Sequence, residues 1–249
     1  MLYKVLLFIL ASVVTAVSVA DALKVGVAAD YPPLVYKQEG RIVGIEADNA
    51  TAVGGILGRK MTLIDMPFES LIPALQAGEV DIVMSGMSVT AARGEKVMFT
   101  DAYMQVGQMA IMLMANAPKF SHSWSIYRKG MRVGVEPGTT GAEFARDELK
   151  EAQVSYFSGP PAAFEGLRND EIDLYVHDAP TSWLLARSDD NEDLLSLYAP
   201  LTDESLAWAV RKDDEPLAQS LNAALLEMKR NGSLRYILNR WIPVTVEVR

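Results

Sequence analysis

The chain has 249 residues, half of them hydrophobic, and a formal net charge of −9. This composition excludes a mostly disordered chain, and the charge has the wrong sign for holding nucleic acid or an anionic membrane through bulk electrostatics. With no cysteine and only two histidines, the chain has no disulfide framework or thiolate nucleophile, and a metal centre is disfavoured. We therefore expect a globular protein without cofactor or metal that handles a small molecule.

Residues 1–20 have the layout of a secretory signal peptide. Lys4 precedes an apolar run over 5–17, and the small residues Ser18 and Ala20 follow it. The alternative is a membrane anchor, but the run is shorter than the roughly 20 residues that a spanning helix needs. No cysteine follows for lipid attachment. We expect cleavage near Ala20 and export of a soluble mature protein.

The first half of the mature chain alternates strand and helix patterns. Apolar runs predict strands over 23–28, 60–65 and 80–84, and helical spacing predicts helices over 46–57 and 68–77. A hairpin turn is expected over 36–41. Strand–helix–strand alternation of this kind predicts parallel α/β units.

The second half repeats this alternation and ends in helices. The expected strands are 132–136, 154–157 and 172–176, and the expected helices are 161–169, 180–187, 214–229 and 233–241. A further helix follows the turn over 137–140. Thr140 and Glu143 stand three residues apart there, which predicts a capping box at its start.

An internal similarity links the two halves. Residues 75–86 align without gaps to residues 167–178, sharing Leu, three residues, Glu, an aliphatic residue, Asp and an apolar strand. A generic α/β unit also fits this pattern. The informative feature is the pair of strand exits, because residues 85–86 in the first half correspond to residues 177–178 in the second. Ligands bind beyond the carboxyl ends of strands in open α/β sheets. Two facing lobes are therefore expected to place these exits on opposite walls of one cleft.

Eight ordered segments carry a family likeness. They are 25–33, 44–48, 68–81, 85–93, 99–103, 134–140, 173–178 and 231–241, of which Ser-Gly-Met-Ser-Val-Thr-Ala-Ala-Arg over 85–93 is the most specific. Together they resemble the periplasmic polar amino-acid-binding proteins of ABC importers, solute-binding protein family 3, from about residue 23 to residue 241.

The resemblance implies an α/β, two-lobed periplasmic-binding-protein fold of type II, with two hinge strands and a ligand cleft between the lobes. Such lobes close on the ligand by hinge motion. We place the crossings near 107–112 and 206–210, which are apolar runs without internal glycine or proline. Lobe 1 is then expected to comprise residues 21–108 plus 208–249, and lobe 2 residues 109–207.

The resemblance also implies a clamp for an α-amino acid. Arg93 is expected to hold the carboxylate, because a guanidinium matches its two oxygens with a planar fork. Ser88 and Gly86 match positions where the family's backbone and hydroxyl contact the ligand, and Thr140 opens a helix whose N-terminus suits an anion. Asp178 matches the carboxylate that receives the ammonium. The alternatives are a surface role for Arg93 and helix capping for Thr140 and Asp178.

Further positions in the same segments match ligand contacts of the family, but each also fits an ordinary structural role. Tyr31 and Phe68 match two aromatics that stack on the ligand side chain, although an isolated aromatic more often belongs to the core. Met87 would line the same pocket. Thr90 fits an N-cap at least as well as a ligand contact.

The side-chain specificity is left open by the sequence. Family members that take basic amino acids usually carry an acid where this chain has Ala28, which weakens that interpretation. Glu136 follows a lobe 2 strand and is placed to meet a cationic or amide side chain. His177, next to Asp178, resembles a pair in glutamine-binding members. The alternative for both Glu136 and His177 is a solvent-facing position at the rim of the cleft, without contact to the ligand.

The favoured function is a non-enzymatic periplasmic receptor that delivers a polar amino acid to an inner-membrane ABC permease, as a monomer. The alternative is a cyclohexadienyl or arogenate dehydratase on the same fold, with Glu136 or His177 as the group that promotes elimination. Retention of both Arg93 and Asp178 favours the receptor, although arogenate is itself an amino acid.

Overall fold

The computed structural model describes residues 22–242, except 186–187 and 198. The expected signal peptide and its cleavage site lie outside the described residues, as does the expected end of the helix over 180–187. Within the described part, no helix is long and apolar enough to cross a membrane.

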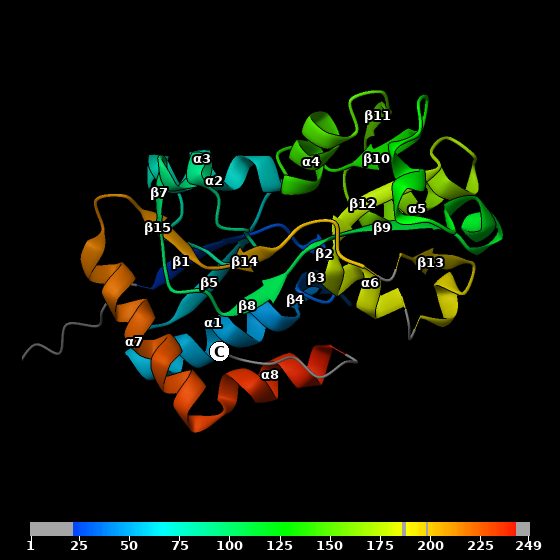
Figure 1. Cartoon of the computed structure of the whole chain (residues 1–249). Helices are drawn as coiled ribbons and strands as arrows, with labels where there is room; N and C mark the ends of the chain where they lie inside the picture. Colours follow the sequence, from blue (N-terminus) through cyan, green and yellow to red (C-terminus); the bar gives the residue numbers. More distant parts are fainter. Residues whose placement is uncertain (1–21, 186–187, 198, 243–249) are drawn as a thin grey trace, which may run out of the picture.

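Two separate five-stranded sheets organise the chain, and we call each sheet with its helices a lobe (Figure 1). The sheet of lobe 1 has the order β5-β1-β6-β15-β7. Its strands are β1 (Leu23–Val27), β5 (Met61–Asp65), β6 (Ile82–Val83), β7 (Val97–Phe99) and β15 (Ala209–Arg211). Strand β1 pairs in parallel with β5 and β6, as the strand–helix–strand alternation predicts.

Helices cover both faces of the lobe 1 sheet. On one side α1 (Ile45–Leu57), α7 (Glu215–Asn231) and α8 (Ser233–Trp241) pack together, and on the other lie α2 (Leu71–Ala77) and α3 (Ala91–Gly94) (Figure 1). A 3₁₀ turn, η1 (Phe68–Ser70), leads into α2. A small antiparallel sheet of β2 (Asp30–Tyr31), β3 (Val35–Gln38) and β4 (Arg41–Val43) follows β1 and contains the expected hairpin.

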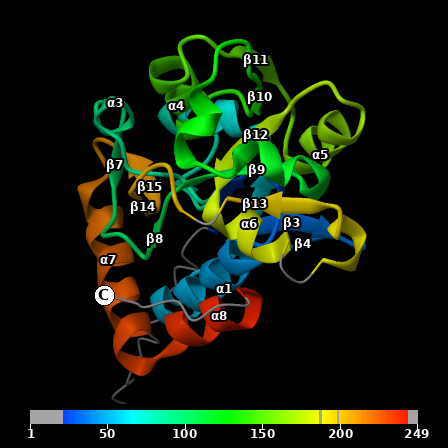
Figure 2. The same cartoon turned by 45° about the vertical axis from the view of Figure 1, so that its right-hand side comes forward.

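Lobe 2 is built on the sheet β11-β10-β12-β9-β13. The strands are β9 (Gln108–Leu113), β10 (Arg132–Val135), β11 (Gln153–Tyr156), β12 (Leu174–Asp178) and β13 (Leu194–Ser196). The helices are α4 (Thr140–Glu148), α5 (Pro160–Arg168), α6 (Ala179–Leu185) and the 3₁₀ turns η2 (Met114–Phe120), η3 (Ser123–Tyr127) and η4 (Asp189–Asn191). Figure 2 shows α4 and α5 against the strands of this sheet.

The central strands are continuous apolar runs because helices cover both of their faces. Val25, Val27, Ile82 and Val83 in lobe 1 are fully buried, and so is Leu174 in lobe 2. These runs are the signal from which the strands were predicted, and the predicted elements within the described residues recur with shifts of a few residues at their ends.

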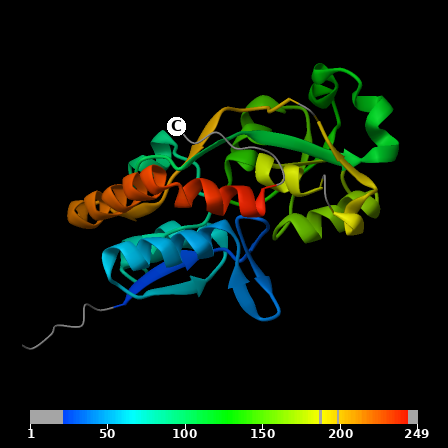
Figure 3. The same ribbon diagram turned by 90° about the horizontal axis from the view of Figure 1, so that it is seen from below.

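The chain crosses between the lobes a few residues before the positions expected. Strands β8 (Met104–Val106) and β14 (Glu204–Leu206) pair as a two-stranded antiparallel ribbon, β8 directly before β9 and β14 directly before β15. The two chain segments that contain them run side by side from one lobe to the other (Figure 3). The placement of the first crossing over 107–112 was wrong, because this run forms most of β9. Its apolar side chains are buried by pairing with β12 and β13 inside the lobe 2 sheet.

Candidate functional site

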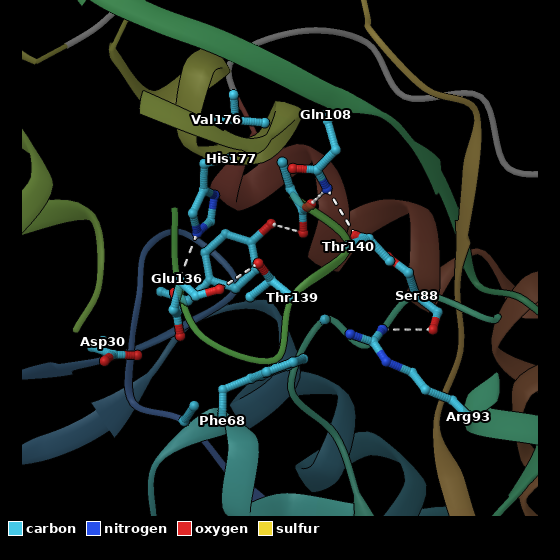
Figure 4. Close-up of a pocket in the computed structure, with 14 residues that line it drawn as sticks. Asp30, Phe68, Ser88, Arg93, Gln108, Glu136, Thr139, Thr140, Val176 and His177 are labelled. Atoms are coloured by element: carbon cyan, nitrogen blue, oxygen red, sulfur yellow. Dashed lines mark hydrogen bonds and ion pairs between the residues drawn. The ribbon is translucent and has the colours of Figure 1, made fainter. Parts of the chain in front are cut away.

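One cavity between the lobes collects all nine residues expected at the site. The open space inside it is only about 20 Å³, room for about one water molecule, so the walls from the two lobes lie close together. Lobe 1 contributes Ala28, Asp30, Tyr31, Phe68, Gly86, Ser88 and Arg93, and lobe 2 contributes Gln108, Glu136, Thr139, Thr140, Val176, His177 and Asp178 (Figure 4).

The two halves of the internal repeat meet in this cavity. Strand β6 leads to Gly86 and strand β12 ends at His177 and Asp178, so both strand exits line it, as the alignment predicts. Gly86 has a φ of +63°, and a Cβ at this position would lie 2.5 Å from Leu34 Cδ1. Only glycine therefore gives the backbone this path along the cavity wall.

Arg93 projects from α3 into the cavity and is 7% exposed. Its Nη1 donates to the Ser88 carbonyl oxygen at 2.8 Å, and its Nη2 reaches across the cleft to the Gly138 carbonyl oxygen at 3.0 Å. The guanidinium lies 5.4 Å from the centre of the Phe68 ring, a cation–π distance. Thr90 caps α3 by accepting from the Arg93 backbone N–H, which confirms the N-cap interpretation of Thr90.

Burial lowers the pKa of Arg93, and the carboxylates of Glu143, Asp178 and Glu204 oppose this. An arginine starts from so high a pKa that it stays charged at neutral pH. The cavity therefore holds a desolvated cation whose hydrogen bonds go to carbonyl oxygens, which are weaker partners than a carboxylate.

Asp178 ends β12 on the opposite wall. Its Oδ2 accepts from the Tyr31 hydroxyl at 2.7 Å and its Oδ1 accepts from Gln108 Nε2. Burial raises the pKa of Asp178, and the neighbouring His177 together with these hydrogen bonds partly opposes that rise. Tyr31 is buried and its ring meets the His177 ring edge to face at 4.6 Å. A carboxylate and an arginine thus line the same cavity from different lobes.

The N-terminus of α4 faces the cavity, and the residue that caps it is Thr139, one position before the predicted cap Thr140. The capping box of Thr140 and Glu143 was wrong, since Thr139 is the N-cap and accepts from the Ala142 backbone N–H at 3.2 Å. Thr139 has extended backbone angles, whereas Thr140 is already helical. The Thr140 hydroxyl donates to Glu204 Oε2 at 2.7 Å and accepts from Gln108 Nε2 at 3.0 Å.

Two carboxylates, Glu136 and Asp30, line the cavity from different lobes. Glu136, buried in lobe 2, has its Oε2 3.7 Å from His177 Nε2, and Asp30 projects from β2 in lobe 1. Partial burial and then the charge of Glu136 raise the pKa of Asp30 to about 6. Burial disfavours a charge on His177, but the carboxylates of Glu136 and Asp178 raise its pKa overall. This part of the cavity therefore carries an excess of negative charge.

A second, larger cavity of about 600 Å³ continues outward from this pair. Asp30, Phe68 and Glu136 line both cavities, so the two form one cleft. Asp65 and Glu69 add carboxylates, while Lys37 pairs with Asp65 at 2.5 Å. The outer cleft is acidic and has room for groups longer than a small side chain.

Four polar residues in or next to the cavity were missed at the sequence level: Asp30, Gln108, Thr139 and Glu204. A weak signal existed for Gln108, the polar residue that opens the apolar run of β9. Its role depends on strand register, because β9 pairs Gln108 with Asp178. Among the described residues, no group of histidine and acidic side chains is arranged to hold a metal ion.

Comparison with known proteins identifies the same family that the sequence motifs resemble. Residues 23–244 match the model of the bacterial extracellular solute-binding proteins, family 3. ABC transporter arginine-binding protein 1 of Escherichia coli (strain K12) is 32% identical over 96% of this chain and 98% of its own length.

Two solved structures share the fold over most of the chain. An ancestral arginine-binding protein bound to arginine is 31% identical, with a TM-score of 0.83 over 90% of this chain and 99% of that one. An ancestral amino acid-binding protein described as a precursor of cyclohexadienyl dehydratase is 32% identical, with a TM-score of 0.83 over 89% and 95%. The chain belongs to the bacterial extracellular solute-binding proteins of family 3.

Proposed function

We propose that this protein is a periplasmic receptor that captures an amino acid with a cationic side chain and delivers it to an ABC permease. The observation that carries the proposal is the pair Arg93 and Asp178, held on opposite walls of one interlobe cavity. A free α-amino acid has one carboxylate and one ammonium. The pair offers each of them an oppositely charged partner, and the two partners come from different lobes.

The clamp acts by exchanging weaker contacts for stronger ones. Arg93 donates to the carbonyl oxygens of Ser88 and Gly138, and a ligand carboxylate is a better acceptor for the same N–H groups. The N-terminus of α4 adds backbone N–H groups to the same anion. On the other side Asp178 accepts from Tyr31 and Gln108, and a ligand ammonium adds the opposite charge that this partly buried carboxylate lacks.

The cationic side chain is inferred from the wider end of the cleft. Asp30 and Glu136 approach it from different lobes, and the outer cavity beyond them is acidic. These carboxylates stand in for the acid that is missing at Ala28. The names of the relatives and structural neighbours that bind arginine are consistent with this choice.

The test is a calorimetric screen of the twenty amino acids on protein that has been unfolded, freed of ligand and refolded. We expect arginine or lysine to bind most tightly and to raise the melting temperature by mass action. Failure of every amino acid to bind would overturn the proposed function. Tightest binding of a neutral or acidic amino acid would overturn the assignment of a cationic side chain alone.

Affinity for arginine is expected to fall as the solution is acidified. Asp30 is ionised above its pKa of about 6, and below that pH a bound cation must displace its proton. For one linked proton, affinity drops about tenfold between pH 8 and pH 5. The charges of Glu136, Asp65 and His177 also act on the Asp30 carboxylate.

The variant Asp30→Asn distinguishes the contribution of Asp30 to the pH dependence of binding from that of its neighbours. The variant keeps Glu136, Asp65 and His177, so any pH dependence that persists does not come from Asp30. We expect weaker arginine binding at pH 8 and a flatter pH profile, measured by calorimetry. An unchanged profile in Asp30→Asn would show that Asp30 does not meet the cation.

We further propose that the receptor acts as a monomer and performs no chemistry. The dehydratase alternative has one point in its favour, the Glu136–His177 pair in the cleft, since an acid–base pair is what an elimination requires. It is tested by incubating the protein with prephenate or arogenate and following phenylpyruvate or phenylalanine. We expect no product above the uncatalysed rate, and a turnover that Glu136→Gln removes would favour the enzyme.

A further inference from the structure

Glu46, the second residue of α1, is a fully buried carboxylate outside the ligand cavity. Its Oε1 accepts from the Gly86 backbone N–H at 2.8 Å and from the Tyr103 hydroxyl at 2.7 Å. Its Oε2 accepts from Trp208 Nε1 at 3.1 Å and from Asn49 Nδ2 at 3.3 Å. All four partners are donors, and an ionised carboxylate is the side chain that offers about four acceptor sites and no donor.

Three of the four partners of Glu46 belong to the cavity wall and to the two lobe crossings. Gly86 lines the ligand cavity. Tyr103 directly precedes the crossing strand β8, and Trp208 lies between β14 and β15 at the other crossing. The rings of Tyr103 and Trp208 stack at 5.7 Å, so the two crossing segments are also packed on each other here.

We propose that Glu46 is a positioning residue that holds the Gly86 segment in its ligand-binding shape and couples that segment to both lobe crossings. The affinity part of this inference rests on the proposed function. The physical reason is the cost of a buried N–H without an acceptor, which the Gly86 amide would become if Glu46 moved. Because Oε1 is shared, a change at Tyr103 shifts the acceptor that Gly86 uses.

Two variants test the coupling. Glu46→Gln replaces one acceptor oxygen with an amide NH₂ group that meets donors, and Tyr103→Phe removes one donor while leaving the Gly86 bond and the ring packing available. Two readouts are used: the calorimetric affinity for L-arginine, and amide hydrogen exchange over residues 85–88 in the ligand-free protein. For Tyr103→Phe we expect about tenfold weaker binding and about tenfold faster exchange at Gly86, with larger changes for Glu46→Gln.

The chain supplies two matched controls. Tyr175→Phe makes the same chemical change at a buried tyrosine whose hydroxyl has no hydrogen-bond partner within the described part of the chain. Val53→Ala lowers the stability of lobe 1 by emptying a buried site in α1, without touching the Glu46 hydrogen bonds. We expect both to leave the arginine affinity and the exchange at Gly86 within twofold of wild type.

The outcomes are distinguishable. Wild-type affinity and exchange in Tyr103→Phe would overturn the coupling. If Val53→Ala loses affinity and Gly86 protection along with melting temperature, Glu46 acts through stability alone and the inference fails. If the wild-type protein binds no amino acid, the proposed function fails, while the exchange at Gly86 in ligand-free protein still decides whether Glu46 holds this segment.

Discussion

Replacing Arg93 with alanine is expected to weaken arginine binding at least about 100-fold, because a desolvated ligand carboxylate loses its charged partner. The remaining donors on that side, the N-terminal amides of α4, carry only a partial positive charge. Among the described residues that line the cavity there is no other arginine or lysine, so no fixed cation replaces Arg93. Calorimetry, with a thermal-shift titration as a second method, measures the loss.

Two controls sharpen the Arg93 result. Arg93→Lys keeps the charge but not the planar fork, and we expect affinity between that of wild type and that of Arg93→Ala. Arg235→Ala removes an exposed arginine from α8, far from the cavity, and should bind as wild type. An Arg93→Ala affinity within threefold of wild type would contradict the clamp.

Asp178→Asn is expected to separate binding from stability. Affinity should again fall at least about 100-fold, since the ligand ammonium loses its carboxylate. The ligand-free protein should melt at the same temperature or higher. The sign follows from the pKa of Asp178, which burial raises: the ionised form is then disfavoured in the folded state at neutral pH, and a neutral amide removes that penalty.

Asp173 provides the opposite control. Its pKa is lowered by hydrogen bonds from Arg132, so its charge stabilises the fold above its ordinary pKa. Asp173→Asn should therefore lower the melting temperature and leave the arginine affinity unchanged. A parallel loss of affinity and stability in Asp178→Asn would identify Asp178 as a structural residue.

Some parts of the site could be predicted because each depends on a short stretch of chain. The segment 85–93 contains Gly86, Ser88 and Arg93 with the cap Thr90, and a local turn fixes their relative positions. The repeat between 75–86 and 167–178 identifies the two strand exits. These signals are local in sequence, and the structure brings the nine expected residues into one cavity.

Other parts depend on pairing between distant segments. Gln108 becomes a partner of Asp178 because β9 and β12 are antiparallel in one register, and the apolar run of β9 gives no sign of it. The first crossing was misplaced for the same reason, since an apolar run fits a hinge strand and a central strand equally well. Only its pairing with β12 and β13 shows that this run is a central strand of lobe 2.

The sequence by itself determined the family, the two α/β lobes and the residues at the strand exits, because periodicity and short motifs record local geometry. Only the tertiary structure added Asp30 to Asp178 and Glu136, the acids that the sequence had placed in the cavity. Asp30 acquires its raised pKa because folding buries it and lobe 2 brings Glu136 near it. Glu46 gains its proposed role because three donors from distant segments converge on it. Electrostatic environment and hydrogen-bond satisfaction are properties of neighbours in space, so they arise only once the lobes are folded and closed upon each other.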